Sequence, residues 1–185
     1  MKTIKEALNE LKTFSEFVVT LGYAAILQND VDLAIEAQYV KDKIRSLSYD
    51  IRVATIYAVR SSRSDKKEIT QLASLLQVGV AAKEISDGID DLVEIVIRGG
   101  GAHPVLRTIY GNSETLTKFQ IGKNSKLLGK TLKAVKDMNI KILFIRREKD
   151  YIISDDIYIT PLKENDVIVV KSSEEENEKV REIFE

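Results

Sequence analysis

The sequence predicts an α+β protein of two domains, in which a bundle of long antiparallel helices precedes a small α+β domain. Two patterns support this fold class. Across residues 1–110, apolar residues recur at alternating spacings of three and four, which is the period of one face of a helix. After residue 111, clusters of β-branched residues alternate with turn-forming residues, which favours short strands. We therefore expect one domain in residues 1–112 and a second in residues 113–185.

The first half predicts three helices, each bounded by a break in the apolar pattern. Asn29 and Asp30 form the first break, and Asp30 is a plausible N-cap of the second helix. A polar stretch at residues 61–65 forms the second break, with Ser64 or Asp65 as the next N-cap. The three apolar stripes are Ile4, Ala7, Leu11, Phe14, Val18, Leu21 and Ala25; Ala37, Val40, Ile44, Leu47, Ile51, Ala54 and Ala58; and Leu75, Val78, Ala82, Ile85, Ile89, Leu92 and Val96.

Helices of this length, about 25 to 33 residues each, pack as a bundle when short turns join them. Three glycines at residues 99–101 end the third helix, and Pro104 suits the first turn of a short fourth helix that ends near Tyr110. Such a bundle leaves apolar surface uncovered, so we predict that it associates with itself as a homodimer. The small residues that permit close approach of helices are Ala24, Ala25, Ala34, Ala37, Ala54 and Ala58.

The second half predicts the order strand, helix, strand, strand, strand, helix. The strands are expected at residues 116–121, 140–145, 151–153 and 167–170, with a charged hairpin turn at residues 146–150. Asn124 and Ser125 can cap the first helix, which would continue through Leu127, Leu128, Leu132 and Val135. The last helix is expected at residues 174–184, and its acidic start suits the helix dipole.

The composition excludes several classes of function. The chain has no cysteine, which excludes disulfides, thiolate metal sites and cysteine nucleophiles. A single histidine, His103, argues against histidine-based catalysis, and we find no base–nucleophile pair, so we expect no enzyme. The net charge of −1 argues against a dedicated nucleic-acid binder. The most apolar N-terminal stretch, residues 17–27, falls far short of the roughly 20 residues that a spanning helix needs.

Two motifs in the second half resemble a known family. Residues 125–132 match the pattern S-x-L-x-G-K-T-L, and a second pattern joins Ile145, Arg146 and Arg147 to Ile152 and Ile153 and then to residues 162–170. Together they resemble the C-terminal regulator-of-potassium-conductance domain, also called TrkA-C, over about residues 113–185. The sequence departs from the family at Asn165, where glycine is usual, and at Ser154, where proline is common. Asparagine tolerates the positive φ that a turn at position 165 would require.

The helical half resembles the PhoU-like domain that precedes TrkA-C in some archaeal and bacterial proteins. The resembling stretches are residues 23–27, 84–91 and 103–107. The order of the two domains agrees with that architecture.

This resemblance implies a cytoplasmic, ligand-sensing regulatory subunit of a potassium or other cation channel or transporter. TrkA-C domains dimerise and bind a small anionic effector near the dimer interface, which in some bacterial members is cyclic di-AMP. The membrane partner would be a separate protein, and this chain would reach the membrane only through it. The glycines at residues 99–101 follow a helix and lack G-x-G-x-x-G spacing, so we expect no dinucleotide site.

Glu84, Asp87 and Asp91 form a candidate site for a divalent metal on the third helix. Carboxylates at helical spacing converge on one face and can share a cation, and PhoU-like proteins carry D/E-x-x-x-D motifs of this kind. The matching motif at Asp42 has Ser46 in place of its second carboxylate. A solvated acidic face is the alternative. If metal binds, the chain would instead resemble a PhoU-like module that signals in phosphate or metal homeostasis.

Arg146, Arg147, Ile152 and Ile153 form a candidate site for an anionic, nucleotide-type effector. Strand alternation places one guanidinium on each face of the sheet. One arginine can clasp a phosphate, and we expect the other to pair with Asp150, Asp155 or Asp156. Residues 118–136 contain lysines but no Asp or Glu, so this stretch can also attract an anion, an acidic channel loop or a membrane. The alternative is an ordinary solvated face. The lysines of this stretch are Lys118, Lys123, Lys126, Lys130, Lys133 and Lys136, of which Lys126, Lys130 and Lys133 would share one helical face.

Overall fold

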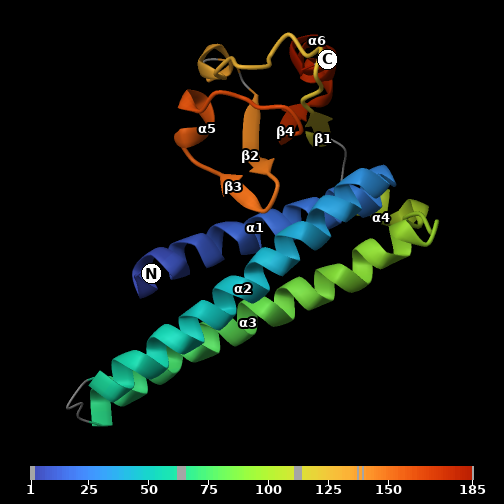
Figure 1. Cartoon of the computed structure of the whole chain (residues 1–185). Coiled ribbons are helices and arrows are strands. Elements are labelled where there is room, and N and C mark those ends of the chain that lie inside the picture. The colour runs from blue at the N-terminus through green and yellow to red at the C-terminus, as the bar shows by residue number, and fades with distance from the viewer. Residues whose placement is uncertain (1–2, 62–65, 111–113, 137, 139, 185) are drawn as a thin grey trace. The chain divides into compact units, whose positions relative to one another are not determined.

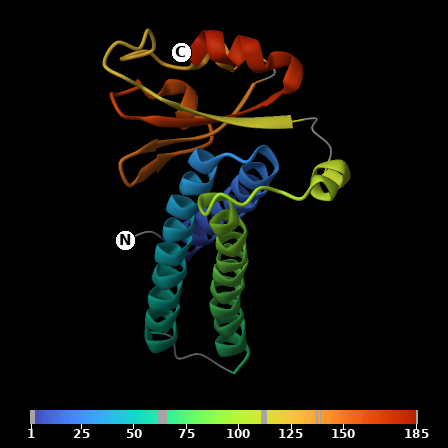
Figure 2. The same ribbon diagram turned by 90° about the vertical axis from the view of Figure 1, so that its right-hand side faces the viewer.

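The computed structural model describes residues 3–61, 66–110, 114–136, 138 and 140–184. The chain divides into two compact units, Met1–Ala102 and His103–Glu185. The first unit consists of long helices and the second contains a four-stranded sheet, so the predicted α+β class is confirmed (Figures 1 and 2). This division assigns helix α4 (Pro104–Tyr110), which we expected to close the helical half, to the second unit.

The first unit is built from α1 (Ile4–Gln28), α2 (Val31–Ser61) and α3 (Lys66–Ile97). Asp30 acts as the predicted cap, because its carboxylate accepts the Leu33 N–H at 3.0 Å. Gly99 ends α3 with a φ of 82°, and its N–H donates to the carbonyl of Val96 at 2.9 Å. The expected cap at Ser64 or Asp65 lies outside the described residues.

Burial confirms the predicted core stripes of α1 from Ala7 to Ala25 and of α2 from Ala37 to Ile51. The stripe predicted for α3 is partly wrong, because Val78 and Ile85 remain 49% and 48% exposed. The buried face of α3 is instead Gly79, Ala82, Ser86, Ile89, Val93 and Val96.

Small residues explain this difference on α3. Gly79 lies on the face that packs against α2, and the Ser48 hydroxyl donates to the Gly79 carbonyl at 2.9 Å. Gly22 of α1 is buried directly against the side chain of Ile89. Glycine and serine do not count as apolar in a periodic pattern. The apolar residues alone therefore predicted a packing face that is rotated about the axis of α3 relative to the observed one.

The second unit contains β1 (Glu114–Gln120), β2 (Lys141–Arg147), β3 (Asp150–Ile152) and β4 (Val167–Ser173). The strand order is β1-β4-β2-β3, and each neighbouring pair is antiparallel. Helix α6 (Asn177–Phe184) contributes Val180 and Phe184 to the core on one face of this sheet. There the rings of Phe184 and Phe119 stack with centroids 5.0 Å apart. The expected strands are therefore confirmed, with ends that differ by at most three residues.

The helix predicted to start at Asn124 and Ser125 does not form. The chain there makes turns and a short 3-10 helix, η1 (Lys133–Val135). Gly129 has a φ of 76° and donates its N–H to Leu162, whose own N–H donates to Lys130, each at 2.9 Å. Leu132 and Val135 are nevertheless buried in the core.

This correction removes the shared helical face that we expected for Lys126, Lys130 and Lys133. One further short element, α5 (Asp156–Ile159), was not predicted. The last helix, expected at residues 174–184, begins as the 3-10 helix η2 (Glu174–Glu176) and continues as α6.

Candidate functional site

An ion pair between a partly exposed arginine and a fully buried carboxylate anchors the end of strand β2. The guanidinium of Arg147 donates from Nε and Nη2 to the two carboxylate oxygens of Asp166, at 2.8 and 2.7 Å. Asp166 is fully buried and also accepts the Lys163 N–H at 2.8 Å. Nη2 of Arg147 also donates to the Pro161 carbonyl at 2.9 Å. The hydrogen bonds that Arg147 donates to Asp166 raise the pKa of Arg147, so this side chain is a fixed cation.

The expected partners of this arginine were wrong. Arg147 pairs with Asp166, which lies 19 residues away, and not with Asp150, Asp155 or Asp156. The turn before Asp166 makes this geometry possible. Asn165 adopts the positive φ of 67° expected at this position, and its N–H donates to the Ile121 carbonyl at 2.8 Å. Arg147 is therefore a structural residue that joins β2 to the loop before β4.

Arg146 lies on the opposite face of the sheet, as the alternation predicted. It stands opposite Tyr151 in the β2–β3 pairing, whereas Arg147 stands opposite Asp150. Its Nη1 donates to the Glu148 carbonyl in the hairpin turn at 3.2 Å, and the side chain is half-buried. Of the two predicted phosphate-binding arginines, Arg146 is thus the one that is not committed to the buried carboxylate.

The two isoleucines of the predicted effector site lie in the same hairpin. Ile152 pairs with Ile145 in register and packs partly buried against the hydrophobic core of the sheet. Ile153 follows at the end of β3 and is half-buried. The hairpin therefore brings the four predicted residues close together, although the contacts of Arg147 and Ile152 are structural.

Beside β1 lies an open hollow that contains two of the predicted lysines, Lys118 and Lys123. Its other lining residues come mainly from residues 119–125 and from Phe184. Nζ of Lys123 lies 4.0 Å from Glu164, at the limit of an ion pair. The hollow therefore presents positive charge at the edge of the sheet that β1 forms.

The predicted metal ligands on α3 are held differently from one another. Asp87 forms ion pairs with Lys83 and with Arg45 of α2, whose Nη2 lies 3.2 Å from Oδ1. Glu84 and Asp91 are exposed and make no ion pair within the described part of the chain. Among the residues that the structure describes, no group of three or more carboxylate or imidazole side chains is arranged to hold a metal. The metal site stays a prediction, and the Asp87 carboxylate forms ion pairs with two basic side chains.

Replacing Asp87 by asparagine is expected to lower the free energy of unfolding slightly at pH 7. The hydrogen bond from Lys83 lowers the pKa of the Asp87 carboxyl, with help from Arg45. A carboxyl with a lowered pKa stabilises the fold above its ordinary pKa and loses that contribution as the pH falls through the folded-state pKa. Urea unfolding of the natural chain and of Asp87→Asn, measured from pH 7 into the acid range, should therefore show that the difference in their free energies of unfolding decreases as the pH falls. Asp91→Asn, which breaks no described ion pair, is the control.

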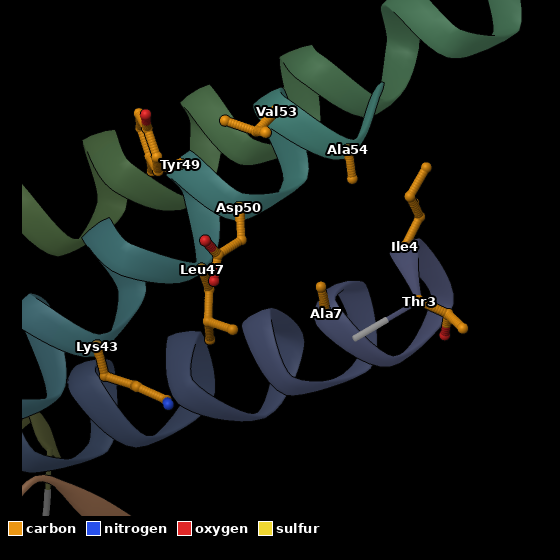
Figure 3. A pocket seen from close by; sticks show the side chains of 9 residues that line it. All are labelled: Thr3, Ile4, Ala7, Lys43, Leu47, Tyr49, Asp50, Val53 and Ala54. Atoms are coloured by element: carbon orange, nitrogen blue, oxygen red, sulfur yellow. The ribbon is translucent and has the colours of Figure 1, made fainter. Parts of the chain in front are cut away.

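A groove opens between the N-terminal turns of α1 and the middle of α2 (Figure 3). It holds about 350 Å³ and is lined mainly by apolar side chains, with Lys43 and Asp50 as its charged members. The Lys43 ammonium lies 5.9 Å from the centre of the Phe14 ring, so it is partly engaged by the core of the bundle. No sequence motif pointed to this groove, because it arises from the meeting of two distant segments.

None of the described helices combines the length and the apolar character that crossing a bilayer requires.

Comparison with known families assigns the second unit. Residues 116–185 match the family model described as the TrkA-C domain. No curated protein matches the chain. The PhoU-like identity of the helical unit stays a prediction, although a bundle of long helices is present. Residues 116–185 of this chain are therefore a TrkA-C domain, and such a domain indicates a regulatory role in cation transport.

Proposed function

We propose that this chain is a non-enzymatic, ligand-sensing regulatory subunit of a cation channel or transporter, with potassium as the transported ion. The TrkA-C domain at residues 116–185 is the observation that carries this proposal. In this role the chain acts in the cytoplasm as a homodimer, and a separate protein forms the membrane pathway.

The effector in this proposal is a small anion of the nucleotide type. Two features of the second unit support that chemistry. Arg146 is the hairpin arginine whose guanidinium is outside the Asp166 ion pair, and a planar guanidinium binds phosphate with two parallel hydrogen bonds. Separately, at the opposite edge of the sheet from this hairpin, the hollow beside β1 places Lys118 and Lys123 where their ammonium groups attract phosphate.

Regulation then requires that the effector bind one arrangement of the dimer more tightly than another, because equal binding shifts no equilibrium. The absence of enzymatic chemistry is part of the proposal. It is supported by the lack of cysteine and by the position of His103, whose Nδ1 accepts the Val105 N–H at 3.3 Å at the start of α4.

A thermal-shift panel tests the proposal. Cyclic dinucleotides, adenine nucleotides, inorganic phosphate and divalent cations are added separately to the full chain. We expect one nucleotide to raise the Tm, because a ligand at 100 times its Kd stabilises the folded state by about 2.7 kcal/mol. Arg146→Ala should reduce the shift, and Lys149→Ala, in the same exposed turn, should leave it unchanged. A panel in which no anion changes the Tm would contradict the proposal.

A further inference from the structure

Beside the buried face of α3 runs an exposed apolar stripe. We call this stripe the α3 docking face. Val78, Ile85 and Ile95 are 49%, 48% and 44% exposed. A Cβ atom added to Gly88 would meet no heavy atom within 4 Å, so the backbone there is open to a neighbour. The complete stripe is Val78, Ala81, Ile85, Gly88, Leu92 and Ile95.

The spacing of this stripe indicates that its occupant is a helix. The six positions follow one another at intervals of three, four, three, four and three, which is the spacing of a seam between two packed helices. Ala81 and Gly88 are small enough to admit a second backbone. The stripe extends over about 25 Å at 1.5 Å per residue, which corresponds to about five turns of a partner helix.

The charge beside the stripe indicates the chemistry of that helix. Glu84 and Asp91 lie seven residues apart along one border, and both are exposed. Neither forms an ion pair among the described residues, whereas Asp87 and Glu94 are paired with Lys83 and Arg98, respectively. The border of the apolar stripe therefore keeps two uncompensated negative charges, two helical turns apart.

A second copy of the same face fits poorly. If two α3 helices packed antiparallel across Gly88, Glu84 of one copy would face Asp91 of the other. Like charges at these flanking positions oppose association. A partner with positive charges at the same heptad spacing would remove the repulsion and add attraction.

We propose that the α3 docking face binds an amphipathic helix of a partner protein, which presents an apolar stripe bordered by lysine or arginine. This inference deepens the proposed function and rests on it for the partner's identity. The cytoplasmic segments of membrane transport proteins are rich in lysine and arginine. The transport protein is therefore the expected source of the helix.

The test uses a synthetic peptide of about 18 residues, the span of the stripe, with leucine at seam positions, lysine elsewhere and one tryptophan. The chain contains no tryptophan, so a blue shift of the emission reports burial of the peptide. We expect the full chain to bind this peptide. Ile85→Glu should weaken binding by about tenfold or more, because it places a carboxylate in the seam. Ile56→Glu, which changes a 62% exposed residue on α2, is the matched control and should bind normally.

Charge reversal gives a second, independent readout. The double variant Glu84→Lys, Asp91→Lys should lose the lysine peptide and gain binding to a version with glutamate in place of lysine. Equal binding of both peptides by the natural chain would overturn the inference. It would also be overturned if sedimentation showed that Ile85→Glu converts a dimer to a monomer while no peptide binds, since the face would then belong to a second copy. The nucleotide thermal shift of Ile85→Glu separates the two proposals, because effector sensing can persist when docking fails.

Discussion

Replacing Arg147 by alanine is expected to lower the free energy of unfolding of the TrkA-C domain by about 3–5 kcal/mol. The substitution removes two hydrogen bonds to Asp166 and leaves that carboxylate fully buried, with the Lys163 N–H as the remaining donor among the described contacts. An uncompensated buried charge is costly because it is no longer solvated by water or neutralised by a partner. The loss also releases the Pro161 carbonyl, so the loop before β4 should loosen first.

Hydrogen exchange measured by mass spectrometry on the full chain locates this effect. Protection should fall in peptides that cover β2, β4 and the loop between Pro161 and Asp166, and it should be unchanged in α1, α2 and α3. Arg146→Ala is the matched control, since it changes the neighbouring arginine without touching Asp166. Arg147→Lys should recover part of the protection, because it restores the charge but cannot form the paired hydrogen bonds. Equal loss in the Arg146 and Arg147 variants would contradict the structural role of this ion pair.

The strands around this ion pair were predictable, whereas the partner of Arg147 was not. The apolar run at residues 142–145 is buried on both faces of the sheet, and burial on both faces produces a continuous apolar sequence. Proximity in sequence pointed to Asp150, Asp155 and Asp156, whereas the partner Asp166 lies 19 residues from Arg147. Asp166 is brought beside Arg147 by the pairing of β2 with β4, in which Arg146 stands opposite Val167.

The spacing of apolar residues also gave a wrong prediction where contacts between distant segments determine the structure. Leu127, Leu128, Leu132 and Val135 have helical spacing, yet Gly129 takes a positive φ and its segment bonds to Leu162. On the acidic face of α3, the sequence showed the carboxylates but not the cations of α2 that approach them. Arg45 reaches Asp87, and Lys41 pairs with Asp90, across a helix interface that no spacing within α3 reveals.

Replacing Gly22 by alanine is expected to destabilise the helical unit, although the same change in a helix interior ordinarily stabilises by about 1 kcal/mol. A Cβ atom at this position would fall well inside the van der Waals contact distance of the Ile89 Cγ2 atom. Ile89 cannot easily turn away, because a β-branched side chain has one strongly preferred rotamer in a helix. Overpacking of this kind costs about 1–3 kcal/mol, so the clash should outweigh the gain in helix propensity.

Gly88→Ala is the matched control, since it changes a glycine inside α3 that has open space around it. It should raise the free energy of unfolding by roughly 0.5–1 kcal/mol, so the two substitutions should act with opposite signs in urea unfolding. Truncating the obstructing side chain gives the decisive comparison. In an Ile89→Ala background, Gly22→Ala should become stabilising, because the methyl group then enters space that Ile89 has vacated. If Gly22→Ala stabilised the natural chain as much as Gly88→Ala does, α1 and α3 would not be packed as closely as the contact between Gly22 and Ile89 indicates.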